Sequence, residues 1–187
     1  MDRVPLIDEN ATPEIAALSA KIRGARGGQL HVFYRALLHS PGLASGWFEF
    51  NNAVRFGTRL DARVRELVIM RVAAMTGCEY VWKVHEAQYA AAAGVTPQQV
   101  AALRSPHTFQ AGTTREGSRS EVFDERERAL LAYVEAMTRD VAVPEGVFTE
   151  MSRHFDDRET VEVTVLVGAY NMQTRVLRAL GIDSWKA

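Results

Sequence analysis

The sequence predicts an all-α fold, and three observations lead to that prediction. Apolar residues recur at the three- and four-residue spacings that place side chains on one face of a helix. Proline and glycine stand where the predicted helices begin and end. No second segment offers a pairing partner to a strand. The 187 residues are enough for a single helical domain over residues 1–187, which could contain two related helical halves.

The N-terminal region contains three predicted helices. Residues 12–14 (Thr-Pro-Glu) have the N-cap, first-turn proline and acidic residue of a helix start, and Gly24 ends that helix. The second helix is predicted from helical spacing, and residues 40–42 end it. The apolar residues that show this spacing are Leu30, Phe33, Tyr34, Leu37 and Leu38. A third helix covers residues 43–56 and closes at Gly57.

The central region contains the most apolar predicted helix. Asp61 is a suitable N-cap for residues 62–76, and Gly77 breaks or kinks this helix. A new helix begins at Cys78 and runs through an alanine tract to a C-terminal glycine, Gly94. Residues 96–99 form a capping box with proline at the first helical position, and they start a short helix that reaches about Arg104.

The C-terminal region begins after a polar segment. Residues 105–120 are rich in Gly, Ser and Thr without an apolar period, so we expect a linker or mobile loop there. Helical patterns follow at residues 124–139 and 144–155. In residues 161–167 valine alternates with other residues, which is typical of a strand. However, the segment starts like a helix at residues 156–159 and keeps helical character to Gly181. We therefore predict a helix. An Arg-Glu dipeptide precedes an apolar helical segment twice, at residues 65–66 and at residues 158–159. The repetition indicates either a duplicated helical unit or a chance similarity.

Charge and composition exclude several functions. The formal net charge is −1 and no Lys/Arg run is present, so we expect no nucleic-acid or anionic-lipid partner. The single cysteine excludes an intramolecular disulfide. The first residues do not show the apolar region of a secretory signal, and no apolar run approaches the ~18 residues of a membrane span, so we expect a cytoplasmic protein. The histidines have no metal-site spacing with Cys78 or one another, and no phosphate-binding glycine loop follows a strand.

Glu66, Cys78 and His85 are the candidate catalytic residues. A thiolate at the start of a helix is stabilised by the helix dipole, so the pKa of Cys78 is expected to fall. Helical spacing places Cys78, Val81, Trp82 and His85 on one face. The Gly77 break should fold the two helices together, so that Glu66 meets His85 in an acid–imidazole pair. Alternatively, the cysteine and histidine are structural core residues and Glu66 pairs with a nearby arginine.

These residues also carry a resemblance to a known superfamily. The spacing of Glu66, Cys78, Val81 and His85, together with the phrase at residues 76–82, resembles the core motif of the alkylhydroperoxidase D and carboxymuconolactone decarboxylase superfamily. Residues 26–28, 38–41 and 169–172 also look like the family, and the resemblance covers roughly residues 24–183. It implies an alkylhydroperoxidase D-like helical fold and a closed homo-oligomer, commonly a trimer or hexamer.

The resemblance also implies roles for the motif residues. Redox members use two cysteines, at the positions of Cys78 and Val81, while the glutamate and histidine relay protons. Val81 leaves Cys78 without a resolving thiol, so peroxide reduction would need an external thiol. The decarboxylase branch acts on a small lactone acid without a metal or organic cofactor, and its chemistry needs proton movement rather than a disulfide.

Three functions follow as hypotheses. The first is a cofactor-free, lyase-like acid–base enzyme that acts on a small organic acid or lactone, with His85 as acid or base and Glu66 fixing its tautomer. Arg71 could then anchor a substrate carboxylate, and Tyr80 and Trp82 could line an apolar pocket, although such residues are also common as solvated charge and core. The second is a peroxiredoxin-like activity of Cys78 with an external thiol. The third is a non-catalytic oligomeric member.

Overall fold

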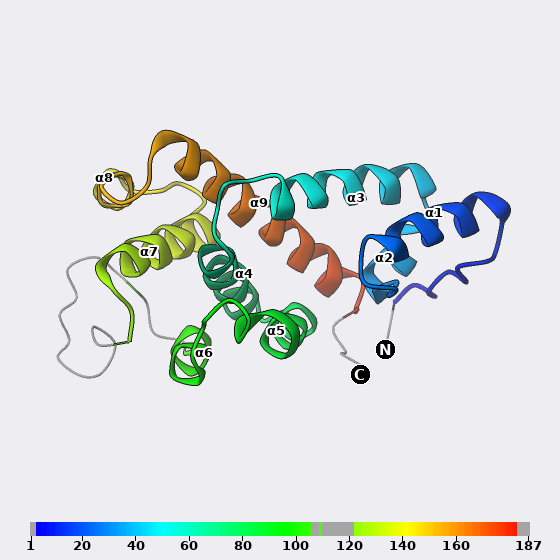
Figure 1. Ribbon diagram of the computed structural model, residues 1–187, viewed down its shortest axis with the longest axis horizontal. Helices are drawn as coiled ribbons and strands as arrows, with labels where there is room; N and C mark the ends of the chain where they lie inside the picture. Colours follow the sequence, from blue (N-terminus) through cyan, green and yellow to red (C-terminus); the bar gives the residue numbers. More distant parts are fainter. Residues whose placement is uncertain (1–2, 106–108, 110–121, 183–187) are drawn as a thin grey trace. The chain divides into compact units, whose positions relative to one another are not determined.

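The computed structural model describes residues 3–105, 109 and 122–182 (Figure 1). Its elements are α1 (Pro13–Gly24), α2 (Val32–Leu37), α3 (Pro41–Phe56), α4 (Ala62–Thr76), α5 (Glu79–His85), the π-helical turn η1 (Glu86–Ala90), α6 (Pro97–Arg104), α7 (Glu125–Asp140), α8 (Glu145–Ser152) and α9 (Asp157–Ala179). No strand occurs in these described residues, so the predicted all-α class is confirmed. The predicted loop at 105–120 lies almost wholly outside them.

The contacts divide the chain into two compact units. The described parts of residues 1–57 and 176–182 form the first unit, and those of residues 58–175 form the second. Within the described ranges, no helix is long and apolar enough to cross a membrane. The single domain expected over residues 1–187 stays a prediction.

The first unit consists of α1 and α2 packed against α3. The Thr12 side chain accepts a hydrogen bond from the backbone N–H of Ile15, which caps α1 at the predicted residue. Edge-to-face aromatic packing joins α2 to α3, with the ring centroids of Phe33 and Trp47 5.0 Å apart. Helix α3 begins at Pro41, two residues before the predicted start, because proline is well suited to the first turn of a helix.

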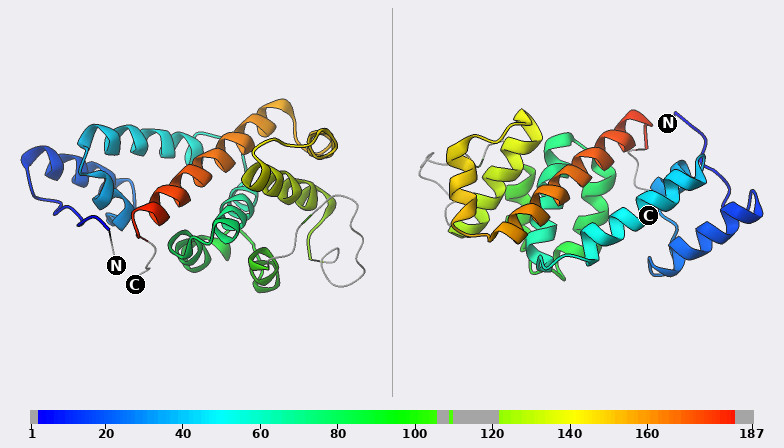
Figure 2. Two further views of the ribbon diagram at one scale, coloured as in Figure 1. Left: turned by 180° about the vertical axis from the view of Figure 1, so that it is seen from behind. Right: turned by 90° about the horizontal axis from the view of Figure 1, so that it is seen from above.

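The second unit is organised around α4, which contacts α5, α6 and α7. Asp61 caps α4 as predicted by accepting from the backbone N–H of Val64. Residues 66–73 are all buried, so this helix is surrounded by its neighbours rather than exposed on one side. Helix α7 also contacts α8, and α9 lies beside α7, where the hydroxyls of Tyr133 and Thr164 are 2.7 Å apart. Figure 2 shows these helices from two further directions.

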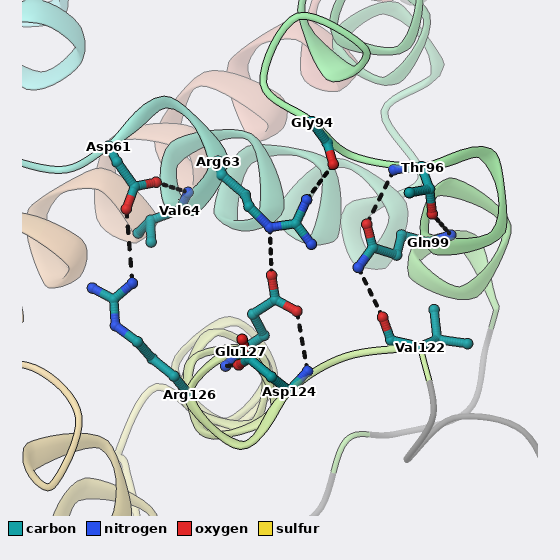
Figure 3. Close-up of polar contacts among 10 residues, drawn as sticks. All are labelled: Asp61, Arg63, Val64, Gly94, Thr96, Gln99, Val122, Asp124, Arg126 and Glu127. Atoms are coloured by element: carbon teal, nitrogen blue, oxygen red, sulfur yellow. Dashed lines mark hydrogen bonds and ion pairs between the residues drawn. The ribbon is translucent and has the colours of Figure 1, made fainter.

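A group of polar contacts fixes the ends of α4, α6 and α7 (Figure 3). The Arg63 guanidinium pairs with Glu127, with 2.6 Å between Nε and Oε1, and also donates to the carbonyl of Gly94. Glu127 in turn completes a capping box with Asp124 at the start of α7. The predicted capping box of α6 is present, and its Gln99 side chain donates to a backbone carbonyl just before α7. The start of α7 is thereby held against both helices.

The last helix resolves the ambiguous valine pattern. Val163, Leu166 and Val167 are buried, whereas Val161 and Val165 are exposed, which is the spacing of a helix and not of a strand. Asp156 and Glu159 form reciprocal side-chain to backbone hydrogen bonds at its start. The predicted helix is therefore confirmed. The repeated Arg-Glu dipeptides occupy different places, because Glu159 caps α9 on the surface while Glu66 is a buried interior residue of α4.

Glu162 connects α9 to the segment that precedes α4. Its carboxylate accepts from the backbone N–H of Arg59 at 2.8 Å and from Nε of Arg158 at 2.9 Å. Burial raises the pKa of the Glu162 carboxyl, but these hydrogen bonds and the charges of the two arginines together lower it below its ordinary value. The interaction therefore favours the ionised carboxylate.

The chain departs from the prediction after His85. We predicted a continuous helix from Cys78 to Gly94, but α5 ends at His85, the wider turn η1 follows, and residues 91–94 form turns. Sequence periodicity shows which residues share a face, but it does not show whether a carbonyl bonds to the fourth or the fifth residue along the chain. A single π-turn of this kind is frequently found at functional sites.

Candidate active site

The joint between α4 and α5 determines where the candidate residues lie. Gly77 adopts a left-handed conformation, with φ of 64°, which glycine accepts without a Cβ clash. The backbone N–H groups of Gly77 and Cys78 donate to the carbonyls of Ala74 and Ala73 at 3.2 and 2.9 Å. These bonds form a Schellman motif, which ends α4 and turns the chain so that α5 packs back against it.

Glu66 and His85 meet across this joint. The distance from His85 Nδ1 to Glu66 Oε2 is 2.6 Å, and each residue is only 4% exposed. The contact expected from the sequence is therefore present. A carboxylate oxygen accepts, so Nδ1 donates this hydrogen bond, and the contact fixes the orientation of the His85 ring. A buried acid–imidazole pair of this geometry can carry out general acid–base chemistry.

Two tyrosines that we did not predict contact the His85 ring. The Tyr89 ring, from η1, has its centroid 5.1 Å away and is tilted by 42°. The Tyr170 ring, from α9, has its centroid 5.7 Å away in an edge-to-face arrangement. Tyr89 could have been found because it is four residues after His85. Tyr170 lies in the segment 169–172 that resembles the family, but it comes from a distant helix, and no local signal places its ring beside His85.

Cys78 lies at the N-cap of α5 rather than at its first helical residue. Its side chain makes no capping hydrogen bond, and the residue is fully buried. Val81, which takes the place of the second cysteine, is also buried. A buried thiol meets a reagent in solution only after local opening, so the surroundings of Cys78 do not resemble those of an exposed nucleophile.

Arg71 forms a buried ion pair. Its Nε lies 2.8 Å from Glu135 Oε1, and Nη1 donates to the carbonyls of Leu103 and Ser105 at 2.6 and 2.9 Å. Glu135 also accepts from the backbone N–H of Phe109 at 2.8 Å. These protein groups join α4 to α7 and to the chain that follows α6. The predicted role of Arg71 in holding a substrate carboxylate stays a prediction.

Tyr80 and Trp82 are both buried on α5. The Trp82 indole donates to Glu86 with Nε1 and Oε2 3.1 Å apart, and the Arg104 guanidinium lies 5.0 Å from the centre of its ring. Trp82 therefore links α5 to η1 and α6. Its predicted part in a substrate pocket, like that of Tyr80, stays a prediction. Among the described residues, no group of three or more His, Cys, Asp or Glu side chains is placed to hold a metal ion.

Comparison with known proteins gives one relative by sequence and several solved structures with a similar fold. The chain is 28% identical over 140 residues to the uncharacterized protein YnjA of Escherichia coli K12, which covers 74% of this chain and 68% of YnjA. The debrominase Bmp8, solved as a cysteine-to-alanine variant in complex with 2,3,4-tribromopyrrole, superposes with a TM-score of 0.76 at 17% identity, over 98% of this chain and 91% of Bmp8.

A third relative is an alkylhydroperoxidase AhpD core from Ralstonia eutropha JMP134, an uncharacterized peroxidase-related protein. It superposes with a TM-score of 0.67 at 19% identity, over 96% of this chain and 90% of its own. These structures establish the AhpD-like helical fold. Residues 41–136, which contain Glu66, Cys78 and His85, match the carboxymuconolactone decarboxylase family. The chain is a member of the carboxymuconolactone decarboxylase family.

Proposed function

We propose that the protein is a cofactor-free acid–base enzyme that acts on a small organic acid or lactone, with a lyase or decarboxylase type of reaction. The observation that carries this proposal is the buried hydrogen bond between His85 Nδ1 and Glu66 Oε2. Glu66 holds the ring in one tautomer and compensates the charge when His85 is protonated. His85 Nε2 then exchanges a proton with the substrate.

Valine at position 81, where redox members have a second cysteine, supports proton transfer rather than redox chemistry. Acid–base chemistry at His85 needs no thiol, so it is compatible with valine at position 81. A dithiol cycle needs a second sulfur close to Cys78, and this chain has only one cysteine. Arg71, Tyr80 and Trp82 are the proposed substrate-binding residues of the same site, although Arg71 would have to exchange Glu135 for a substrate carboxylate.

Turnover of carboxymuconolactone, followed by its ultraviolet absorbance and by CO₂ release, tests this proposal. We expect His85→Ala to reduce kcat by about a hundred-fold to ten-thousand-fold, the usual contribution of one general acid or base. Cys78→Ser should retain most of the activity. His154→Ala is the matched control, because this histidine is remote from Glu66 in the chain and pairs with Glu150 instead. Equal losses in the His85 and Cys78 variants would contradict the proposal.

A one-cysteine peroxidase is the second candidate, and the position of Cys78 favours it. The residue stands at the N-cap of α5, within two turns of His85. In this reaction the thiolate attacks one peroxide oxygen, the O–O bond breaks, water or an alcohol leaves, and a sulfenic acid forms. One external thiol then gives a mixed disulfide with loss of water, and a second thiol releases Cys78 as a thiol and leaves as a disulfide. Trapping with dimedone after one equivalent of hydrogen peroxide detects the sulfenic acid. Absence of the adduct, with carboxymuconolactone turnover intact, would eliminate this candidate.

We also propose that the protein forms a homo-oligomer, a trimer or hexamer as in its family. Large apolar side chains are exposed on α3 and α9, among other places, and such exposure favours an interface that a partner covers. They are Leu43, Phe50 and Phe56 on α3, and Val161, Val165 and Met172 on α9. Light scattering coupled to size-exclusion chromatography should give a mass of three or six chains, and a monomer would contradict the proposal.

A screen with neither lactone turnover nor peroxide consumption would favour a non-catalytic oligomer. The cytoplasmic location stays a prediction.

A further inference from the structure

We infer that Tyr170 is a positioning residue of the candidate site and holds the His85 ring in the orientation in which Nδ1 faces Glu66. This inference rests on the proposed acid–base function, because it concerns the histidine that we propose to move the proton. It gives α9 a part in the site, although α9 lies beyond residues 41–136, which match the family. In this role Tyr170 acts on His85 and not on the substrate.

A single hydrogen bond leaves a histidine ring with an alternative orientation. Rotation of an imidazole about its Cβ–Cγ bond has a broad, roughly two-fold energy profile. A half turn of His85 would bring the carbon Cδ2 to the place of Nδ1, and the 2.6 Å contact with Oε2 of Glu66 would be lost. The hydrogen bond therefore favours one orientation, but a neighbour that is packed against the ring is needed to block rotation between the two.

Tyr170 is such a neighbour. Its ring centroid lies 5.7 Å from that of His85, with the two ring planes at 84°. The two residues are only 2% and 4% exposed, and the dense packing of a protein interior leaves little room for a ring to turn. Rotation of the imidazole thus requires the tyrosine to move as well. Tyr89 also contacts the His85 ring, but it is partly exposed, so its side chain is less constrained than that of Tyr170.

Hydrogen bonds between α9 and α7 fix the position of Tyr170. The next residue, Asn171, donates from Nδ2 to Oγ1 of Thr138 on α7 at 3.0 Å. Earlier in α9, the hydroxyl of Thr164 lies 2.7 Å from that of Tyr133 on α7. Helix α7 in turn packs against α4, which carries the carboxylate partner of the histidine. The tyrosine ring therefore cannot shift unless a helix that is bound on both sides of it shifts too.

The orientation of His85 matters because proton transfer depends on where the ring nitrogens lie. General acid–base catalysis requires the donor and acceptor atoms to be within hydrogen-bond reach, and a small misplacement of a catalytic group lowers the rate strongly. A ring that turned over would present carbon atoms where its nitrogens should lie. We therefore expect loss of the Tyr170 ring to lower kcat by roughly tenfold or more, with KM within about twofold of wild type.

Nitrogen-15 NMR of histidine-labelled protein tests the positioning role without any turnover. The His85 signals are assigned by comparison with His85→Gln, at a pH at which the imidazole is neutral. They report which ring nitrogen carries the proton and how fast this proton exchanges with water. Wild type and Tyr170→Phe, which keeps the ring, should show one tautomer with the proton on Nδ1. Tyr170→Leu should show a mixture of tautomers and exchange that is faster by roughly tenfold or more, because looser packing opens the site more often.

Tyr133→Leu is the matched control. Tyr133 is similarly buried and also lies between α7 and α9, but it contacts α9 through the hydroxyl of Thr164. Its loss should lower Tm and leave the His85 signals unchanged, which separates positioning from general destabilisation. Circular dichroism establishes that each variant is folded. If Tyr170→Leu does not fold, Tyr170→Met takes its place, because the flexible methionine side chain adapts to irregular space without providing a ring.

Three results would overturn the inference. The first is an unchanged tautomer and exchange rate of His85 in folded Tyr170→Leu or Tyr170→Met. The second is an equal disturbance of the His85 signals in Tyr133→Leu or in Tyr170→Phe. The third, which needs no variant, is the absence of nuclear Overhauser cross-peaks between the Tyr170 and His85 rings in wild type. Failure of the proposed function would be seen separately, as turnover that survives His85→Ala while the tautomer still responds to Tyr170→Leu.

Discussion

The buried pair between Arg71 and Glu135 gives the most quantitative prediction. Both side chains are almost fully buried, at 3% and 2% exposure, and they join α4 to α7 over 64 residues of sequence. Replacement of Arg71 by methionine removes the cation but keeps much of the side-chain volume. Glu135 is then left as a buried carboxylate, supported by the backbone N–H of Phe109 and by Arg139, whose side-chain nitrogen lies 3.4 Å away.

Removing one partner of a buried ion pair costs about 3–5 kcal/mol. We place Arg71→Met at about 3 kcal/mol, because Glu135 keeps two other donors. We place Glu135→Leu at about 5 kcal/mol, because it leaves a buried guanidinium without its carboxylate and removes the acceptor for Phe109. For a chain of this size each kcal/mol lowers Tm by about 2–4 °C, so we expect falls of roughly 6–12 °C and 10–20 °C.

Thermal unfolding followed by circular dichroism at the helix band measures these shifts. The double variant, Arg71→Met with Glu135→Leu, leaves no buried charge, so it should be more stable than the sum of the single losses by at least about 2 kcal/mol. Strict additivity within about 0.5 kcal/mol would refute the reasoning, because the pair would then not interact. A Tm of Arg71→Met within about 2 °C of wild type would refute it as well.

Three further predictions concern other parts of the chain. The pKa of the Glu162 carboxyl is lowered in the folded protein. The ionised carboxylate therefore stabilises the fold at pH values above its ordinary pKa of 4.5, and this stabilisation is lost as the pH falls through the folded pKa. Glu162→Gln should flatten the acid side of a profile of Tm against pH. Gly77→Ala should cost about 1–2 kcal/mol, because alanine is strained at φ of 64°, and an unchanged melting curve would contradict this. Val81→Cys should gain thiol-dependent peroxide consumption in a reductase-coupled assay, and absence of any gain would indicate that burial of Cys78 blocks the reaction.

The helix boundaries were largely predictable because their signals are local. Thr12, Asp61 and Thr96 each accept a hydrogen bond from a backbone N–H three residues later, which is the interaction that their residue type and position predict. Gly77 is similar, since a left-handed residue ends α4 where only glycine fits without strain. The π-turn after His85 has no such signal, because a change of hydrogen-bond register leaves the residue pattern unaltered.

Within the candidate site, only the contact between residues on consecutive helices could be predicted from the sequence. Glu66 and His85 lie on consecutive helices joined by Gly77, so a short break was enough to predict their contact. Tyr170 and Glu135 reach the second unit's interior from distant helices, and periodicity shows only that such residues face inward. It does not show which side chain each of them meets. That is why Arg71 could be predicted as a substrate anchor although Glu135 occupies its guanidinium.

The same helix pair shows why the proposed proton transfer does not need a second cysteine. Glu66 and His85 are joined directly across the α4–α5 joint, and their hydrogen bond passes through neither Cys78 nor position 81. Valine at position 81 removes the partner that a disulfide requires, but it is buried and fills the core much as a cysteine would. The acid–base chemistry that we propose therefore does not depend on a dithiol, and valine at position 81 is compatible with the geometry of the pair between Glu66 and His85.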